Sequence, residues 1–172
     1  YEVSLDGAAA VNVGNVTSYT TSALADGMHN LKVRALDALG NPSEWAGPAE
    51  VLVDTVAPVI TLINPENGAR LNITTASTVL AELLDAGSGV DQANVWVKID
   101  DGEWVAPTAI VGGTLYYVVD LPFEATVDKW HSISIKAKDV AGNEKREDAC
   151  FKVELYREGF GFGRLRFPEE SD

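Results

Sequence analysis

The chain has 172 residues, a formal net charge of −13 and one cysteine, Cys150. The charge argues against binding to nucleic acid or to an anionic membrane face, because both need clustered Lys and Arg. A single cysteine excludes an internal disulfide, and no stretch is apolar for long enough to insert across a membrane. The alternating sequence around Cys150 predicts that its side chain is a small buried apolar group.

Apolar and polar residues alternate along much of the chain, which predicts β-strands, and no segment has the spacing of a helix. Before residue 58 we expect strands at 1–5, 17–24, 29–36 and from 51 onward. After it we expect strands at 59–63, 77–84, 94–99, 115–121, 130–137 and 150–156, with a short edge piece at 70–73. Short strands without helices favour an all-β fold made of immunoglobulin-like β-sandwiches.

Two blocks of sequence occur twice. Tyr1–Gly7 followed by His29–Asn41 is similar to Val95–Gly102 followed by His131–Asn143, and both pairs end in Ala-x-Asp-x-x-Gly-Asn. The spacing between the copies is about that of one sandwich domain. We therefore expect two tandem domains and a tail: a partial sandwich at 1–57, a complete sandwich at 58–156, and 157–172.

The first copy lacks the first two strands of the pattern, so its sandwich is incomplete. Such a sandwich exposes apolar faces and unpaired edges. Either the chain is a piece of a longer protein or another segment fills the gap. The tail is a candidate strand donor through Phe160, Phe162, Leu165 and Phe167, which are spaced two apart in pairs. The start of a further module, or an extension packed on the second domain, remains open.

The repeated motif, the linker Val53–Pro58 and the loop Asn64–Gly68 resemble the bacterial immunoglobulin-like repeats of surface proteins and adhesins, related in shape to fibronectin type III modules. The resemblance covers nearly all of Tyr1–Tyr156. It implies an extracellular or cell-surface location, with other protein modules or a second copy as partners. It does not fix a function, because such modules serve as spacers, binders and enzyme appendages.

Carboxylates near the expected domain junction suggest a calcium site. The linker of a tandem sandwich meets loops of the following domain, and Ca²⁺ takes about six to eight oxygen ligands. The candidate ligands are Asp54, Asp85, Asp91 and Asp139, with Asp26 from the first domain. The aspartates of the repeated motif also have a simpler role, because Asp accepts hydrogen bonds from the backbone of its own turn.

We expect no enzyme activity, no catalytic residue and no bound cofactor other than possible Ca²⁺. His29 and His131 occupy equivalent positions, so their recurrence reflects the repeat, and no nucleophile motif is present. Trp96 and Trp104 flank a hairpin and could offer a platform for a surface glycan. Three functions remain open: a structural, display or adhesion spacer, a self-assembling subunit of a surface filament or S-layer that uses strand complementation, and a carbohydrate-binding appendage of a secreted enzyme.

Overall fold

The computed structural model describes residues 1–72, 77–119 and 128–154, which contain twelve strands and no helix. The predicted all-β fold is confirmed. No helix that could cross a membrane occurs in these three ranges. The proposed strand donor in the tail lies outside them, and the boundary between residues 57 and 58 stays a prediction. Residues 1–57 are called the first repeat below, and residues 58–156 the second repeat.

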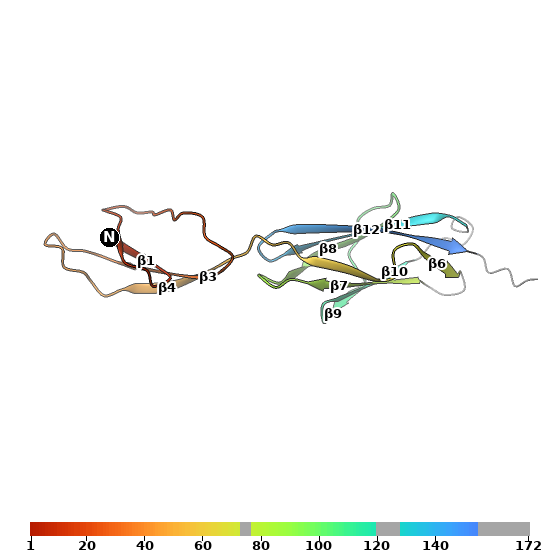
Figure 1. The fold of residues 1–172 in the computed structure, drawn as a ribbon, viewed down its shortest axis with the longest axis horizontal. Coiled ribbons are helices and arrows are strands. Elements are labelled where there is room, and N and C mark those ends of the chain that lie inside the picture. Colours follow the sequence, from red (N-terminus) through yellow and green to blue (C-terminus); the bar gives the residue numbers. More distant parts are fainter. Residues whose placement is uncertain (73–76, 120–127, 155–172) are drawn as a thin grey trace, which may run out of the picture.

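The second repeat is built from two four-stranded sheets (Figure 1). One sheet has the order β5 (Val59–Asn64), β7 (Ser77–Leu84), β10 (Thr114–Val119) and β9 (Ala109–Val111). The other has the order β6 (Ala69–Asn72), β12 (Glu144–Glu154), β11 (Trp130–Asp139) and β8 (Val90–Ile99). All neighbouring strands are antiparallel except β6 and β12, which are parallel.

Alternate residues of both sheets form one apolar core, as expected where two sheets pack face to face. Val79 and Leu115 come from one sheet, Ile135 and Phe151 from the other, and each side chain is at most 1% exposed. This arrangement is the immunoglobulin-like sandwich that the sequence predicts.

The expected burial of Cys150 is wrong, because its side chain is exposed on the outer face of β12. Alternation along a strand places every second residue on the same face. Phe151 and Val153 occupy the inner face, with 0% and 7% exposure, so Cys150 points outward. The alternation of β12 is therefore as predicted, but the buried positions are the odd-numbered residues 151 and 153 and not residue 150.

The first repeat has one four-stranded sheet, in the order β2 (Val11–Asn12), β1 (Glu2–Leu5), β3 (Gly27–Arg34) and β4 (Ala46–Val53). The strand expected at 17–24 is not formed. Its counterpart in the second repeat, β10, is held by β7 and β9 on its two edges. No strand within residues 1–57 corresponds to β7, so the segment has no neighbour with which to pair its backbone.

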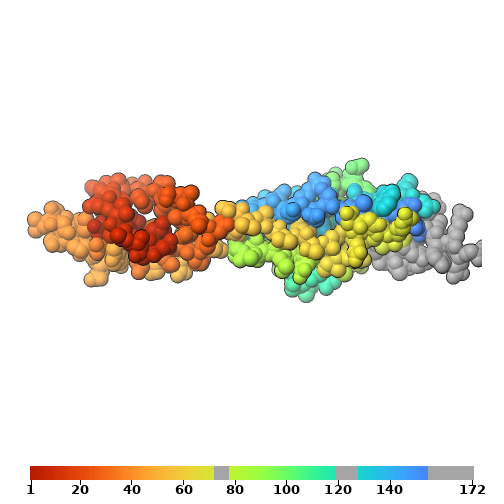
Figure 2. Space-filling model, viewed as in Figure 1, coloured from red at the N-terminus to blue at the C-terminus, as the bar shows by residue number. Residues whose placement is uncertain are grey.

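The two repeats place equivalent residues in very different surroundings. Val3 pairs with Val33 across β1 and β3, as Val97 pairs with Ile135 across β8 and β11. Val33 is 40% exposed, whereas Ile135 is 1% exposed. The sheets are therefore alike, but only the second is covered by a facing sheet. The repeats lie end to end along the long axis (Figures 1 and 2).

This difference predicts unequal effects of truncating equivalent side chains. Ile135→Ala is expected to lower the free energy of unfolding by about 2–5 kcal/mol, because it leaves a cavity in a packed core. Val33→Ala is expected to cost less than about 1 kcal/mol, because less apolar surface is buried there. Urea titrations followed residue by residue with NMR measure both effects. Equal losses would contradict the uncovered face of the first repeat.

Candidate metal site at the joint between the repeats

Three carboxylates from three separate segments meet where the repeats join. Asp54 lies in the linker after β4, Asp85 begins the loop after β7, and Asp139 ends β11. One oxygen of each lies within 4.8 Å of the others. Asp139 is 1% exposed, and the other two are half-buried. The fold thus brings together residues that are far apart in the sequence.

Asp85 and Asp139 are held in place by the turns that they form. Oδ1 of Asp85 accepts hydrogen bonds from the backbone N–H groups of Gly87, at 3.2 Å, and Gly89, at 2.6 Å. Oδ1 of Asp139 accepts one from the backbone of Asn143 at 2.8 Å, and Gly142 supplies the positive φ of 99° that this turn needs. The same motif around Asp37 in the first repeat makes the same bonds, so its predicted role in turns is confirmed.

Asp54 connects the linker to the second repeat. Its Oδ2 accepts a hydrogen bond from the backbone of Ser88 at 2.7 Å, and its carbonyl accepts one from Nδ2 of Asn143 at 3.0 Å. Nδ2 of Asn143 also donates to Asp139 at 2.7 Å. A Cβ atom on Gly87 would lie 2.5 Å from the carboxyl carbon of Asp54, so glycine is required for this close approach.

The electrostatics of the cluster favour a bound cation. Hydrogen bonds from the side chain and the backbone of Ser88 lower the pKa of Asp54 below its ordinary value, which keeps this carboxyl ionised. None of the ion pairs among the described residues involves Asp54, Asp85 or Asp139. Adjacent carboxylates without a cation repel one another, and a divalent ion between them would remove that repulsion.

The other two predicted ligands lie outside this group of three. Asp91 lies near the start of β8, where its Oδ1 accepts a hydrogen bond from the backbone N–H of Ala93 at 3.0 Å. Oδ1 of Asp26 accepts from the backbone and the hydroxyl of Thr55, at 3.0 and 2.9 Å, and so holds the linker from the side of the first repeat. Asp26 therefore stabilises the linker without contributing to the cluster.

Each repeat contains an Asp–His contact, which is not among the predicted sites. Nδ1 of His29 lies 2.7 Å from Asp6, and Nδ1 of His131 lies 2.7 Å from Asp100. Both aspartates have a φ of 50°. Asp6 connects the turn after β1 to the neighbouring strand β3, and Asp100 connects the turn after β8 to the neighbouring strand β11. The signal was present in the sequence, because Asp and His recur together in the two copies.

Of the two tryptophans predicted as a glycan platform, Trp104 is in contact with cations. The centroid of the Trp104 ring lies 4.7 Å from Nζ of Lys136, 5.4 Å from Nζ of Lys98 and 5.6 Å from Cζ of Arg146. Trp96 is half-buried on β8, between the inward-facing neighbours Val95 and Val97. Its predicted place on a sheet face agrees with this position, while glycan binding stays a prediction.

No protein-family model matches the chain, and no curated protein matches it. A solved structure of the fibronectin(III)-like modules of Clostridium thermocellum CbhA is similar over 99% of this chain and 83% of that chain, with 18% identity and a TM-score of 0.44. A likeness at this level gives no information on function.

The contact between His29 and Asp6 predicts a pH dependence. Hydrogen bonds to the Ala25 carbonyl and to Asp6 raise the pKa of His29, and bonds from Asn30 and His29 lower that of Asp6. The stability from His29 is complete below its unfolded pKa of about 6.5 and is lost as the pH rises through its folded pKa. The stability from Asp6 is present above its unfolded pKa and is lost as the pH falls through its lowered pKa.

An NMR titration should therefore give His29 a pKa above 6.5. Asp6→Asn is expected to lower the pKa of His29 only in part, because the Ala25 carbonyl still accepts a hydrogen bond from Nε2. Asp91→Asn is the control, because Asp91 bonds within β8 and does not contact His29, so the pKa of His29 should stay unchanged in this variant. A pKa of His29 unchanged by Asp6→Asn would contradict the role of the carboxylate.

Proposed function

We propose that the chain is a non-enzymatic structural part of an extracellular or cell-surface protein, in which tandem sandwiches set a distance between the segments that they connect. The observation that carries this proposal is the bonded joint between the repeats. The end-to-end arrangement gives the molecule its length (Figure 1). A spacer also needs resistance to bending, and that property depends on the linker.

The linker is short, and hydrogen bonds hold it from both sides. Residues 54–58 separate β4 from β5. Asp26 of the first repeat binds Thr55, while Ser88 and Asn143 of the second repeat bind Asp54. A linker held in this way differs from a flexible one, whose backbone groups are solvated and whose ends move independently. The geometry supports a defined angle between the repeats and thus a role in spacing or display.

Gly87→Ala tests this joint. The added methyl group would displace the Asp54 carboxylate from Ser88, so the pKa of Asp54 should rise towards its ordinary value. Residual dipolar couplings from both repeats should fit one alignment tensor in the unmodified chain and two in the variant. The exposed neighbour provides the control, because Ala86→Ser leaves this contact intact. Two tensors in the unmodified chain would contradict a fixed joint.

We also propose that Ca²⁺ binds the three carboxylates of the joint and stiffens it. All three ligands are hard oxygen donors, which suit Ca²⁺ better than Zn²⁺. Oxygens bound to one Ca²⁺ at about 2.4 Å can lie up to about 4.8 Å apart, and the oxygens of Asp54, Asp85 and Asp139 fall within that limit. An ion held by residues of the linker and of the second repeat would oppose bending between them.

Calcium binding would appear as a change in thermal stability. Ca²⁺ at 100 times its dissociation constant would add about 2.7 kcal/mol, so the melting temperature should be higher in Ca²⁺ than in EDTA. Asp85→Asn should reduce this difference, because the amide keeps the shape of the side chain but removes its charge. Asp91→Asn is the matched control and should retain the full difference. An unmodified chain with the same melting temperature in Ca²⁺ and EDTA would exclude the site.

A further inference from the structure

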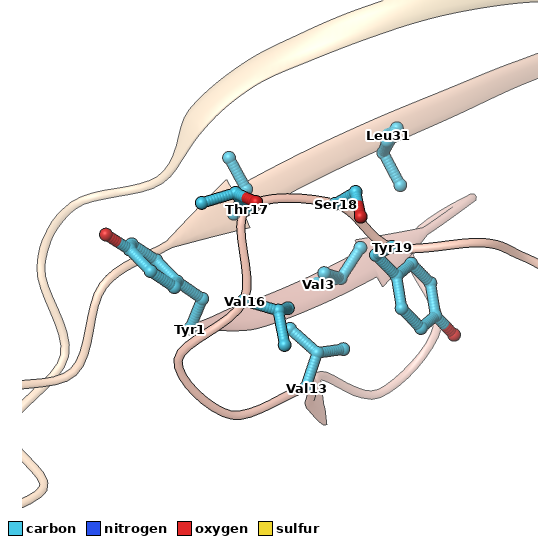
Figure 3. Close-up of a pocket in the computed structure, with 9 residues that line it drawn as sticks. Tyr1, Val3, Val13, Val16, Thr17, Ser18, Tyr19 and Leu31 are labelled. Carbon is cyan, nitrogen blue, oxygen red and sulfur yellow. The ribbon is translucent and has the colours of Figure 1, made fainter.

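The first repeat contains an apolar groove of about 450 Å³ between its sheet and the segment that follows β2 (Figure 3). Val3, Leu31 and Val33 form its floor, and Val16 and Tyr19 lie across from them. A second hollow of about 160 Å³ continues beneath residues 19–22. Among the residues that the structure describes, no charged side chain lines either hollow. The segment therefore lies over the sheet without filling the space beneath it.

The second repeat shows what occupies the equivalent space. There β7 packs Val79, Ala81 and Leu83 against the sheet that contains β8 and β11, and each of these side chains is at most 2% exposed. The same strand pairs with β10 over residues 77–82. The first repeat has the counterparts of β8 and β11, and its segment at 17–24 corresponds to β10. The groove thus lies where a strand equivalent to β7 would pack and pair.

We propose that residues 159–167 of a second copy of this chain bind in the groove as an added β-strand. Phe160 and Phe162 are two residues apart, so both would point into the apolar groove while Gly161 lets the backbone approach the sheet. The strand would pair with residues 17–24 along one edge, as β7 pairs with β10. Backbone pairing combined with side-chain burial is the usual basis of strand addition.

The reach of the chain excludes the same molecule as the donor. From Glu144, beside the joint, to Glu154 the strand β12 runs for about 33 Å at about 3.3 Å per residue. The tip of β12, which ends at Glu154, lies at the end of the second repeat remote from the first repeat (Figure 1). Phe162 follows eight residues later, and these residues span at most about 29 Å. Phe160 and Phe162 therefore fall short of the joint, and only another copy can deliver them.

The segment that would enter the groove and the first repeat have opposite charges. The first repeat has seven acidic residues against two basic ones, whereas residues 157–167 have three arginines and one glutamate; the three remaining acidic residues of the tail, Glu169, Glu170 and Asp172, follow that segment. The arginines would lie near the acidic first repeat once the phenylalanines enter the groove. Opposite charges at the rim of a contact favour association and make it depend on salt.

This proposal goes beyond a spacer, because the contact joins unlike ends of two copies. The tail of one chain would bind the first repeat of the next, which is a heterologous contact that can continue as an open chain of subunits. Assembly would not require the joint or its calcium. The two proposals can therefore fail separately.

Sedimentation velocity of the full chain tests the contact. The unmodified chain is expected to form oligomers that grow with concentration and shrink in high salt, while F160S/F162S is expected to be monomeric. A synthetic peptide with the sequence of residues 157–168 should then bind this monomeric variant. Its binding should shift the amide signals of Leu31 and Val33 and slow amide exchange at residues 17–24. The matched control peptide carries Ser at positions 160 and 162 and should have no effect.

Three results would overturn the proposal. One is a chain that stays monomeric at every concentration while the peptide leaves Leu31 and Val33 unchanged. Another is association that persists unchanged in F160S/F162S. The third is a peptide that shifts only signals of the second repeat, which would show that the tail packs on its own neighbouring domain. A change in melting temperature with Ca²⁺ tests only the proposed calcium site at the joint, not the contact between copies.

Discussion

The fold depends on one constraint: a sheet with one apolar face is stable only when a second sheet covers that face. The second repeat meets this need, and its two sheets bury Val79, Leu115, Ile135 and Phe151 between them. The first repeat uses the same sheet and the same Asp–His fastening, yet Val33 remains 40% exposed. The comparison separates two contributions to the fold, because the hairpin contacts set the register of the strands and the facing sheet supplies the buried apolar area.

The joint shows how one residue type serves two purposes. Asp85 and Asp139 first act as turn formers, because each accepts backbone N–H groups of its own loop. These turns also bring both carboxylates close to Asp54. Asp54 can approach because residue 87 is a glycine and has no side chain in the way. Asn143 completes the connection by donating to both Asp139 and the Asp54 carbonyl. Local turn chemistry has therefore also positioned the acidic cluster.

Alternation and repetition in the sequence predict most of the strands, the sandwich and the three carboxylates that converge, whereas β2, β9 and the first half of β4 are not among the expected strands. The remaining predictions needed information that a pattern does not contain. The phase of β12 depends on which face meets the other sheet, so Cys150 was misplaced. The segment at 17–24 has a strand-like sequence but no neighbour, and a strand needs a partner. Asp91 is acidic and is expected near the junction from the sequence, but its side chain bonds within β8 and lies outside the cluster.

The turn at Asp37–Asn41 has a consequence for how such units can be arranged. It makes the same hydrogen bonds as the turn that receives the linker at Asp139, and it lies at the outer end of the first repeat. The first repeat therefore carries such a turn at its outer end and the linker at its other end. Its two ends differ in chemistry, so the row formed by the two repeats has a direction.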